Sequence, residues 1–165
     1  MNEKYEDFLY IFHSTKAQRS NLENIINKSQ INNTEIISDE KIKDHILKKS
    51  IFAVSKSGTI SLEISKRKIP SIIIYKMNFI NFLIVKMLVK IKYANILNIA
   101  AGQMIIPELL QSKCNPKEIY KLVSSFLEDQ NKIKKQISNT EKVLESLRSH
   151  NLPTDLVADS LKKSL

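Results

Sequence analysis

The stretch that decides the fold is IFAVSKSGTISLEISKRKIPSIIIY, residues 51–75. Its first four residues form a short apolar run, which is typical of a strand buried on both faces. Gly58, one of two glycines in the chain, then predicts a tight turn into a helix, which Pro70 ends. Residues 71–75 form a second apolar run. The stretch therefore predicts a strand, a turn, a helix and a second strand.

The turn in this stretch is a candidate anion site. Ser57, Gly58 and Thr59 lie between a buried strand and a helix N-terminus, where backbone N–H groups are free to meet an anion. Glu63 lies one helical turn beyond Thr59, so the two side chains share a face of the helix. Turns of this kind also occur in α/β proteins that bind no phosphate. These residues alone therefore leave a purely structural role open.

Composition limits the class of protein. An apolar content of 42% and a charged content of 26% over 165 residues are those of an ordinary globular domain with one core. The single cysteine, Cys114, excludes an internal disulfide framework and a cysteine-based metal cluster. No basic segment followed by an apolar one opens the chain, so we expect no signal peptide. Four lysines interrupt the apolar zone at 71–106, and we do not expect it to span a membrane.

The formal net charge of +9 suggests an anionic partner such as a nucleotide, a nucleic acid or an acidic membrane surface. The alternative is an AT-rich genome, which favours lysine, asparagine and isoleucine codons. Nucleic-acid binding lacks its own marks, because the chain has no arginine-rich helix, no aromatic platform motif and no zinc-ligand spacing. We therefore expect no nucleic-acid partner.

The first fifty residues repeat the alternation of strand and helix. Residues 8–13 (FLYIFH) read as a buried strand, and Thr15 with Gln18 predicts a capping box at the start of a helix. Residues 35–38 form a second short strand, and Asp39 then predicts the N-cap of another helix. With residues 51–75, this alternation predicts an α/β fold whose parallel sheet is flanked by helices.

Four further segments follow residue 75. Residues 78–91 predict an amphipathic helix with a basic stripe, which either packs on the sheet or touches an anionic membrane. Residues 93–104 read as a loop whose small residues allow a ligand to approach the backbone. Residues 107–111 read as a short helical turn, in which Glu108 either meets a sugar hydroxyl or faces solvent. Asn115 and the three residues after it are a strong helix start.

Several of these segments together resemble a known family. The motifs SGTxxLE, IPxIIxYKM, LVKIKY, NIAAGQ and IPELLQ occur in this order at residues 57–63, 69–77, 88–93, 98–103 and 106–111. They resemble the donor-sugar half of lipid-A-disaccharide synthases, bacterial glycosyltransferases of the two-domain GT-B type. The resemblance covers most of the chain from about Phe8 onward. It implies a Rossmann-like UDP-sugar-binding domain at 1–112 and a helical C-terminal extension at 113–165, which packs on that domain or on a partner subunit.

The resemblance also implies an activity and a site. The family transfers 2,3-diacylglucosamine from UDP to lipid X, which yields lipid A disaccharide phosphate and UDP, and it uses no metal or other cofactor. In this chain the turn at 57–59 would meet the diphosphate, Glu63 would bind the ribose hydroxyls and Asn98 would orient the donor. The implied substrate-binding residues, none of them catalytic, are Ser57, Gly58, Thr59, Glu63, Asn98, Gly102 and Gln103.

Partners and location follow from the same resemblance. It implies a cytoplasmic protein, peripheral to the anionic inner-membrane surface of a Gram-negative bacterium. It also implies a homodimer formed through the C-terminal helices. The acceptor site of the family lies in its N-terminal domain, so a separately encoded N-terminal half is a further partner that the sequence leaves open. The N-terminal domain and the LPGSR-type loop of the family have no counterpart in the sequence. We therefore expect the donor-binding part of a split or truncated enzyme.

The sequence departs from the family pattern beside Asn98. The family carries arginine and glutamate after the glycine of this motif, whereas this chain has Gln103 and Met104, and Leu97 replaces a proline. Loss of two charged groups beside a sugar-nucleotide site removes charge-assisted contacts. We therefore expect the isolated chain to bind UDP-sugar weakly and to be inactive alone. The alternative is a non-catalytic relic or a dimerisation module of a split gene.

Overall fold

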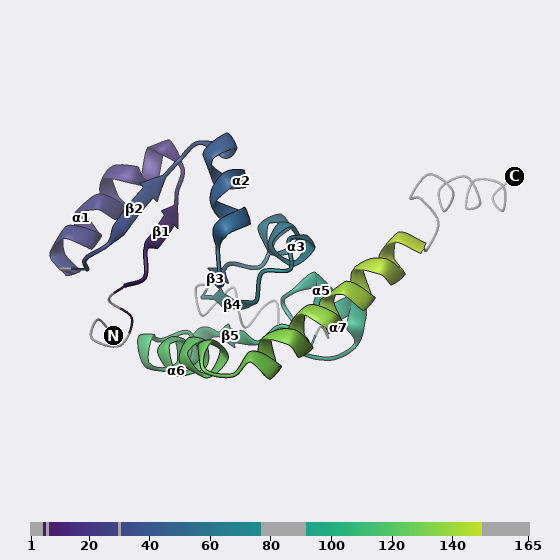
Figure 1. Cartoon of the computed structure of the whole chain (residues 1–165). Helices are drawn as coiled ribbons and strands as arrows, with labels where there is room; N and C mark the ends of the chain where they lie inside the picture. Colours follow the sequence, from purple (N-terminus) through teal and green to yellow (C-terminus); the bar gives the residue numbers. More distant parts are fainter. Residues whose placement is uncertain (1–4, 6, 30, 77–91, 150–165) are drawn as a thin grey trace, which may run out of the picture. The chain divides into compact units, whose positions relative to one another are not determined.

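The computed structural model describes residues 5, 7–29, 31–76 and 92–149. The chain divides into two compact units, residues 1–50 and residues 51–165, whose elements Figure 1 labels. Each unit contains a parallel sheet with helices beside it. The fold is therefore α/β and Rossmann-like, as the sequence predicted. The predicted domain boundary at residue 112 stays a prediction.

The first unit holds a two-stranded sheet. Strand β1 (Tyr10–His13) pairs in parallel with β2 (Thr34–Ile37). The connection between them contains a 3-10 turn, η1 (Lys16–Gln18), and helix α1 (Arg19–Ser29). Helix α2 (Glu40–Lys49) follows β2. Parallel strands need such a crossover because a tight hairpin turn reverses the direction of the chain.

The two predicted helix starts in this unit have different outcomes. Asp39 caps α2 as expected, because its Oδ1 accepts a hydrogen bond from the backbone N–H of Ile42 at 3.4 Å. The capping box at Thr15 is wrong: the Thr15 side chain makes no capping hydrogen bond. Gln18 N–H instead donates to the backbone oxygen of Thr15 at 3.0 Å, which closes η1.

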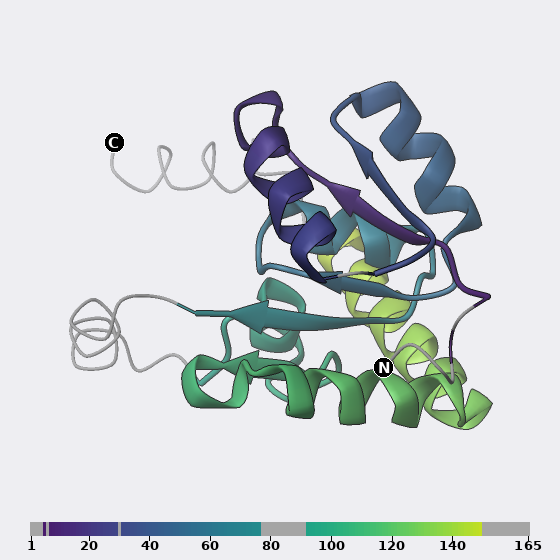
Figure 2. The ribbon, with the colours of Figure 1, turned by 90° about the vertical axis from the view of Figure 1, so that its left-hand side faces the viewer.

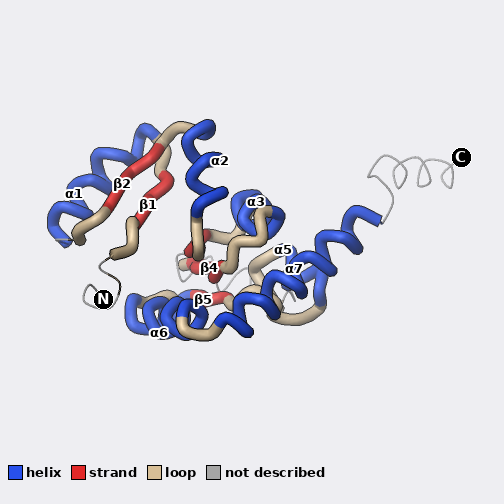
Figure 3. The backbone as a smooth tube through the Cα atoms, viewed as in Figure 1, coloured by secondary structure: helices blue, strands red, loops and turns tan. Residues whose placement is uncertain are grey.

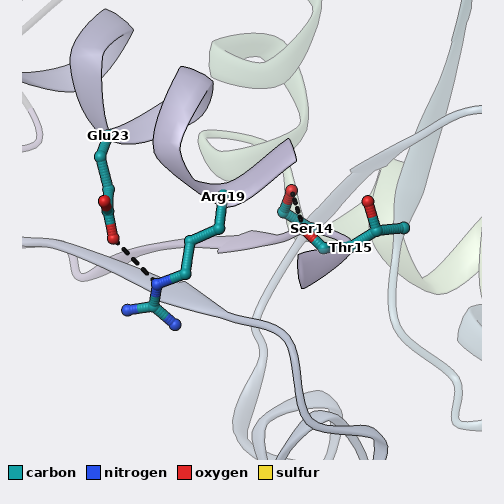
Figure 4. Close-up of polar contacts among 4 residues, drawn as sticks. All are labelled: Ser14, Thr15, Arg19 and Glu23. Carbon is teal, nitrogen blue, oxygen red and sulfur yellow. Dashed lines mark hydrogen bonds and ion pairs between the residues drawn. The ribbon is translucent and has the colours of Figure 1, made fainter. Parts of the chain in front are cut away.

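Other contacts lie at the start of α1 (Figure 4). The Ser14 hydroxyl donates to the Thr15 carbonyl at 3.3 Å. Arg19 and Glu23 form an exposed ion pair at 2.8 Å, one helical turn apart. An exposed pair with this spacing stabilises a helix by only about 0.3–0.5 kcal/mol. The start of α1 is thus set by the 3-10 turn and receives modest help from side chains.

The second unit holds a three-stranded parallel sheet in the order β3-β4-β5. Its strands are β3 (Ala53–Ser55), β4 (Ser71–Tyr75) and β5 (Glu108–Leu110). Its helices and the one 3-10 turn among its described residues are α3 (Thr59–Lys66), α5 (Ile96–Ala101), η2 (Gln111–Lys113), α6 (Pro116–Leu127) and α7 (Gln130–Ser149).

Helices cover both faces of this sheet. Ile72 and Ile73 are adjacent in the central strand β4, so they point to opposite faces, and both are fully buried. On the Ile72 face, α6 contributes Val123 to the core, and Figure 2 shows α6 running alongside the sheet. The Ile73 face is covered from α3, α5 and α7 by Leu62, Leu97, Ala101, Val143 and Leu144. The unit is thus a three-layer α/β/α arrangement.

The C-terminal helices are fixed to the sheet by polar contacts as well. Asn115 caps α6 as predicted, because its Oδ1 accepts from Glu118 N–H at 3.1 Å. In α7, the buried Gln136 amide donates to the Ser71 carbonyl at 2.8 Å and accepts from Ser71 N–H at 2.7 Å. It satisfies the backbone of β4 as a neighbouring strand would.

Strand β3 differs from its prediction. The sequence indicated a strand buried on both faces, but Val54 is 45% exposed and Ile51, just before the strand, is 59% exposed. The cause is the position of β3 at one edge of the sheet. A strand at an edge has a neighbour on one side only, which leaves part of its surface open.

Two segments adopt different secondary structure from that predicted (Figure 3). The predicted loop at 93–104 contains helix α5, which Asn95 caps by accepting from Leu97 N–H at 2.9 Å. The predicted helical turn at 107–111 is largely strand β5, which pairs with β4. Both elements are short, and the contacts that fix them come from distant residues.

The predicted amphipathic helix at 78–91 lies outside the described residues. Among the helices that the structure describes, none is both long enough and apolar enough to cross a membrane.

Candidate functional site

The turn between β3 and α3 has the backbone geometry of an anion site. Gly58 is the N-cap of α3 with φ 150° and ψ −166°, a combination that only glycine adopts without strain. A Cβ placed on Gly58 would meet no atom within 4 Å, so the space beside the turn is open. The first turn of α3 holds no acidic residue. Ser61 N–H donates to the Gly58 carbonyl at 3.1 Å, which leaves the N–H groups of Thr59 and Ile60 as the donors that this turn could offer an anion.

Hydrogen bonds hold this turn against the start of α5. The Ser57 hydroxyl donates to the Ala94 carbonyl at 2.6 Å. The Asn95 side-chain amide donates to the Ser61 hydroxyl at 2.9 Å, and that hydroxyl donates to the Gly58 carbonyl at 2.6 Å. Asn95 and Ser61 are fully buried. The turn is thus fixed from both sides, which preorganises its N–H groups.

Beneath this contact lies the buried carboxylate of Glu108, at the start of β5. Its Oε2 accepts from Ala94 N–H at 2.8 Å, and its Oε1 accepts from Asn95 N–H at 2.9 Å. The carboxylate therefore sits at the N-terminus of α5, where a negative charge is favourable. Glu108 is 8% exposed, so of the two alternatives left open by the sequence, the one in which it faces solvent is wrong. Protein donors occupy both of its oxygens.

Asn98 is fully buried in α5, and its side chain binds protein atoms throughout. Its Nδ2 donates to Glu108 Oε1 and to the Ile106 carbonyl, both at 2.7 Å. Its Oδ1 accepts from the N–H groups of Ile105 and Ile106, both at 2.8 Å. These four bonds use the whole capacity of an amide. Asn98 therefore holds the 105–106 backbone onto α5.

The remaining predicted residues lie at two places. Glu63 is half-buried on α3, one helical turn after Thr59. Gly102 ends α5 in the left-handed conformation with φ 64°, and both it and Gln103 are exposed. Because α5 has six residues, its two ends are about 9 Å apart. The structure thus brings Ser57 and Gly58 to one end of α5 and leaves Gly102 and Gln103 at the other.

Sequence reasoning missed two residues that hold the turn, Ser61 and Asn95, and it missed the burial of a third residue, Glu108. Asn95 carried a usable signal, since an asparagine just before an apolar helical segment is a common N-cap. Glu108 was noticed, but nothing local indicated its burial, because its donors come from Ala94 and Asn95, just before α5, and from Asn98 within it. Among the described residues, no group of three or more histidine, cysteine, aspartate or glutamate side chains is placed to hold a metal.

Comparisons with known proteins agree with the family resemblance of the sequence. A family described as lipid-A-disaccharide synthetase matches residues 1–159. The lipid-A-disaccharide synthase of Rickettsia canadensis (strain McKiel) is 38% identical over 130 residues, which are 78% of this chain and 33% of that protein. The enzyme of the same name from Sulfurihydrogenibium sp. (strain YO3AOP1) is 44% identical over 102 residues, 62% of this chain and 26% of that protein. The chain thus spans a third or less of the length of these curated relatives.

Proposed function

Because the chain belongs to the lipid-A-disaccharide synthase family, we propose that it is the donor-binding part of such a glycosyltransferase. The reaction would transfer 2,3-diacylglucosamine from UDP to lipid X, which yields lipid A disaccharide phosphate and UDP. The observation that carries the proposal is the Gly58 turn, with its glycine-only backbone angles and open space beside it. A buried network that holds a solvent-facing turn in place is what a preformed nucleotide site requires.

The turn and α3 would bind the UDP moiety. The backbone N–H groups near Gly58 and Thr59 would donate to the diphosphate, where the positive end of the helix dipole adds to the attraction. Ser57 contributes by fixing the turn, because its hydroxyl already donates to Ala94. Glu63 would accept hydrogen bonds from the ribose hydroxyls, since a carboxylate close to the phosphate site is well placed for a ribose.

The residues of α5 would shape the surface for the donor sugar. Asn98 would orient the donor through the 105–106 backbone that it holds. Gly102 and Gln103 are exposed at the end of the helix and would contact the sugar directly. Neutral Gln103 forms weaker hydrogen bonds to a sugar nucleotide than a charged side chain would. This difference supports weak binding by the isolated chain.

Catalysis of this kind needs stabilisation of the leaving group and deprotonation of the acceptor hydroxyl. This chain would supply only the first, through its contacts with UDP. The acceptor site and the base would belong to a separately encoded N-terminal half. The completed enzyme would act at the cytoplasmic face of the inner membrane, as a peripheral protein and as a homodimer formed through the C-terminal helices. The purified chain alone would yield no disaccharide.

Titration calorimetry of the purified chain with UDP tests the proposal. We expect weak binding, in the millimolar range typical of an incomplete site, that the Glu63→Ala substitution weakens further. Glu145→Ala is the matched control, because Glu145 is an exposed glutamate on another helix, α7. Absence of heat with millimolar UDP, or equal affinity in all three proteins, would contradict the assignment. Disaccharide formation by the purified chain would contradict the assigned inactivity.

A second candidate is a non-catalytic relic or dimerisation module. Gln103 and Met104 favour it, because they replace a charged pair of the family pattern. This candidate predicts a stable folded dimer in analytical ultracentrifugation that shows no affinity for UDP. The calorimetric experiment therefore separates the two candidates.

A further inference from the structure

Two lysines lie at the C-terminal end of the sheet, next to the candidate anion-binding turn. Lys56 follows the last residue of β3, and Lys76 follows the last residue of β4. The two strands are parallel neighbours, so their carboxyl ends lie side by side at the same end of the sheet. Lys56 is also the residue just before the turn. Its Nζ lies 5.0 Å from the centroid of the Tyr75 ring.

A further lysine, Lys92, lies in the segment before α5 that is hydrogen-bonded to the turn. Lys92 lies two residues before Ala94, whose carbonyl accepts the hydrogen bond from Ser57 at 2.6 Å. Its Nζ lies 5.5 Å from the ring centroid of Tyr93. Lys56 is the neighbour of Ser57 in the chain, and Lys92 is two residues from Ala94. The hydrogen bond between Ser57 and Ala94 therefore holds the backbone near Lys92 beside the turn.

Both ammonium groups remain available to a ligand. Lys56 and Lys92 are exposed, and no described carboxylate forms an ion pair with either of them. A tyrosine ring within about 6 Å attracts an ammonium group and limits its positions, yet it accepts none of the three N–H hydrogens in the manner of a carboxylate. Of the nearby acidic groups, Glu108 is buried and hydrogen-bonded to backbone N–H groups.

We propose that Lys56 and Lys92 supply the positive charge that neutralises the diphosphate bound at the Ser57–Thr59 turn. The inference rests on the proposed function and extends it with two side chains. Backbone N–H groups alone contribute partial charge, whereas UDP brings a diphosphate with at least two negative charges. The phosphate of a lipid headgroup has the same chemistry, so the test includes a membrane arm.

The test compares the affinity of UDP, inorganic pyrophosphate and uridine for the full chain by calorimetry. The variants are Lys56→Gln, Lys92→Gln, the double glutamine substitution and Lys56→Arg, which keeps the charge. Lys121→Gln is the control, because Lys121 is an exposed lysine of α6, on the opposite face of the sheet. We expect each single variant to weaken UDP and pyrophosphate about fivefold and the double variant about 20-fold. Uridine binding and the control should not change.

The outcomes separate this inference from the proposed function. UDP binding that is the same in the double variant as in the wild type would overturn the role of the lysines and leave the donor site in place. Lysine-dependent pyrophosphate binding, with no gain in affinity from the uridine of UDP, would support the lysines and contradict the nucleotide site. Equal pyrophosphate binding by Lys56→Gln and Lys56→Arg would contradict a role for the charge.

The membrane arm uses vesicles of phosphatidylglycerol in a sedimentation assay. Binding of the wild type but not of the double variant, together with unchanged UDP affinity, would reassign the lysines to lipid phosphate and overturn the inference. Vesicle binding that is equal in both proteins is the expected result, because we assign these two lysines to the nucleotide.

Discussion

Gly58 is the residue on which the geometry of the turn depends. Its angles, φ 150° and ψ −166°, are accessible to glycine and cost other residues about 1–3 kcal/mol. An added Cβ would meet no neighbour within 4 Å, so the cost comes from the backbone alone. We expect Gly58→Asn to lower the free energy of unfolding by about 2 kcal/mol in urea titrations.

Gly102 is the matched control for this prediction. Its φ of 64° and ψ of 6° lie near the left-handed helical region, which asparagine tolerates. Gly102→Asn should therefore be nearly neutral. Equal losses at the two glycines would show that the backbone conformation of Gly58 is not special.

Asn98 joins α5, β5 and the segment between them through four hydrogen bonds. Asn98→Ala would leave two buried backbone N–H groups and one oxygen of Glu108 without this partner. We expect a loss of about 3 kcal/mol in the free energy of unfolding. The exposed Asn131 of α7 is the control, and Asn131→Ala should change stability by less than about 0.5 kcal/mol. A neutral Asn98→Ala would mean that this network contributes nothing net.

At the same scale, local chemistry explains which site residues could be predicted. The turn at Ser57, Gly58 and Thr59 could be predicted because a glycine between an apolar run and a helix is a local signal, and its role as an anion site stays a prediction. The burial of Glu108 could not be predicted, because it depends on the N–H groups of Ala94 and Asn95, which lie 14 and 13 residues away, just before α5. In sequence, a single polar residue between apolar neighbours is equally consistent with an exposed side chain and with a buried hydrogen-bond acceptor.

Among the elements, α7 is attached to the sheet by one side-chain amide, which forms the hydrogen bonds that the backbone of a neighbouring strand would form. Gln136 is 4% exposed and exchanges two hydrogen bonds with the start of β4. Gln136→Ala would leave the buried N–H and carbonyl of Ser71 without these partners, and we expect a loss of about 2–3 kcal/mol in chemical unfolding. Exposed Lys134 of the same helix is the control, because Lys134→Ala also changes a helical residue to alanine. Equal effects would contradict the role of the amide.

A second contact of α7 depends on pH. It joins Glu141 of α7 to Lys68, which lies in the connection between α3 and β4. The hydrogen bond from Lys68 to Glu141, at 2.6 Å, and the charge of that carboxylate raise the pKa of Lys68 above its usual 10.5. A lysine whose pKa is higher in the folded state stabilises the protein fully below the unfolded pKa. That contribution is lost as the pH rises through the folded pKa.

Thermal unfolding of Glu141→Gln checks this sign. We expect the melting temperature to fall slightly at pH 8, and the difference from the wild type to vanish well above pH 10.5. The pair is exposed, so salt should reduce the effect. A difference between the proteins that grows above the lysine pKa would contradict this account.

Length explains which elements could be predicted. The predicted start of α6 was correct because Asn115 and Pro116 are local signals at the beginning of a helix of twelve residues. The six residues of α5 and the three of β5 are too short for a hydrophobic period to be distinguished from a loop or a turn. The capping box at Thr15 failed for a different reason, since a 3-10 turn takes the N–H that it would have used.

For the whole molecule, the α/β class was predictable because apolar runs and helical segments alternate along the chain. The division at residue 50 was not, because no linker composition marks it. The alternation predicted one continuous sheet, whereas the described strands form two separate sheets, of two and three strands. Tertiary packing determines which strands pair with each other. The alternation of strands and helices along the sequence contains no information about that pairing.

The two units should differ in their capacity to fold alone. Among the described residues, the first unit buries three apolar side chains, Tyr5, Ile26 and Ile37, whereas the second buries ten and covers both faces of its sheet. A domain of about 50 residues with so few buried apolar groups cannot offset the conformational entropy of ordering it. We therefore expect residues 51–165 to fold alone and residues 1–50 to remain unfolded.

Circular dichroism and urea titration of the two fragments test this expectation. Residues 51–165 should retain helical signal and unfold in one cooperative transition, because their three layers form a complete core. Residues 1–50 should lack a transition. The Gln136→Ala substitution introduced into the longer fragment is the internal control, since it should lower the midpoint as it does in the full chain. A longer fragment without cooperative unfolding would mean that the first unit supplies part of the core, and the units would then be one folding domain.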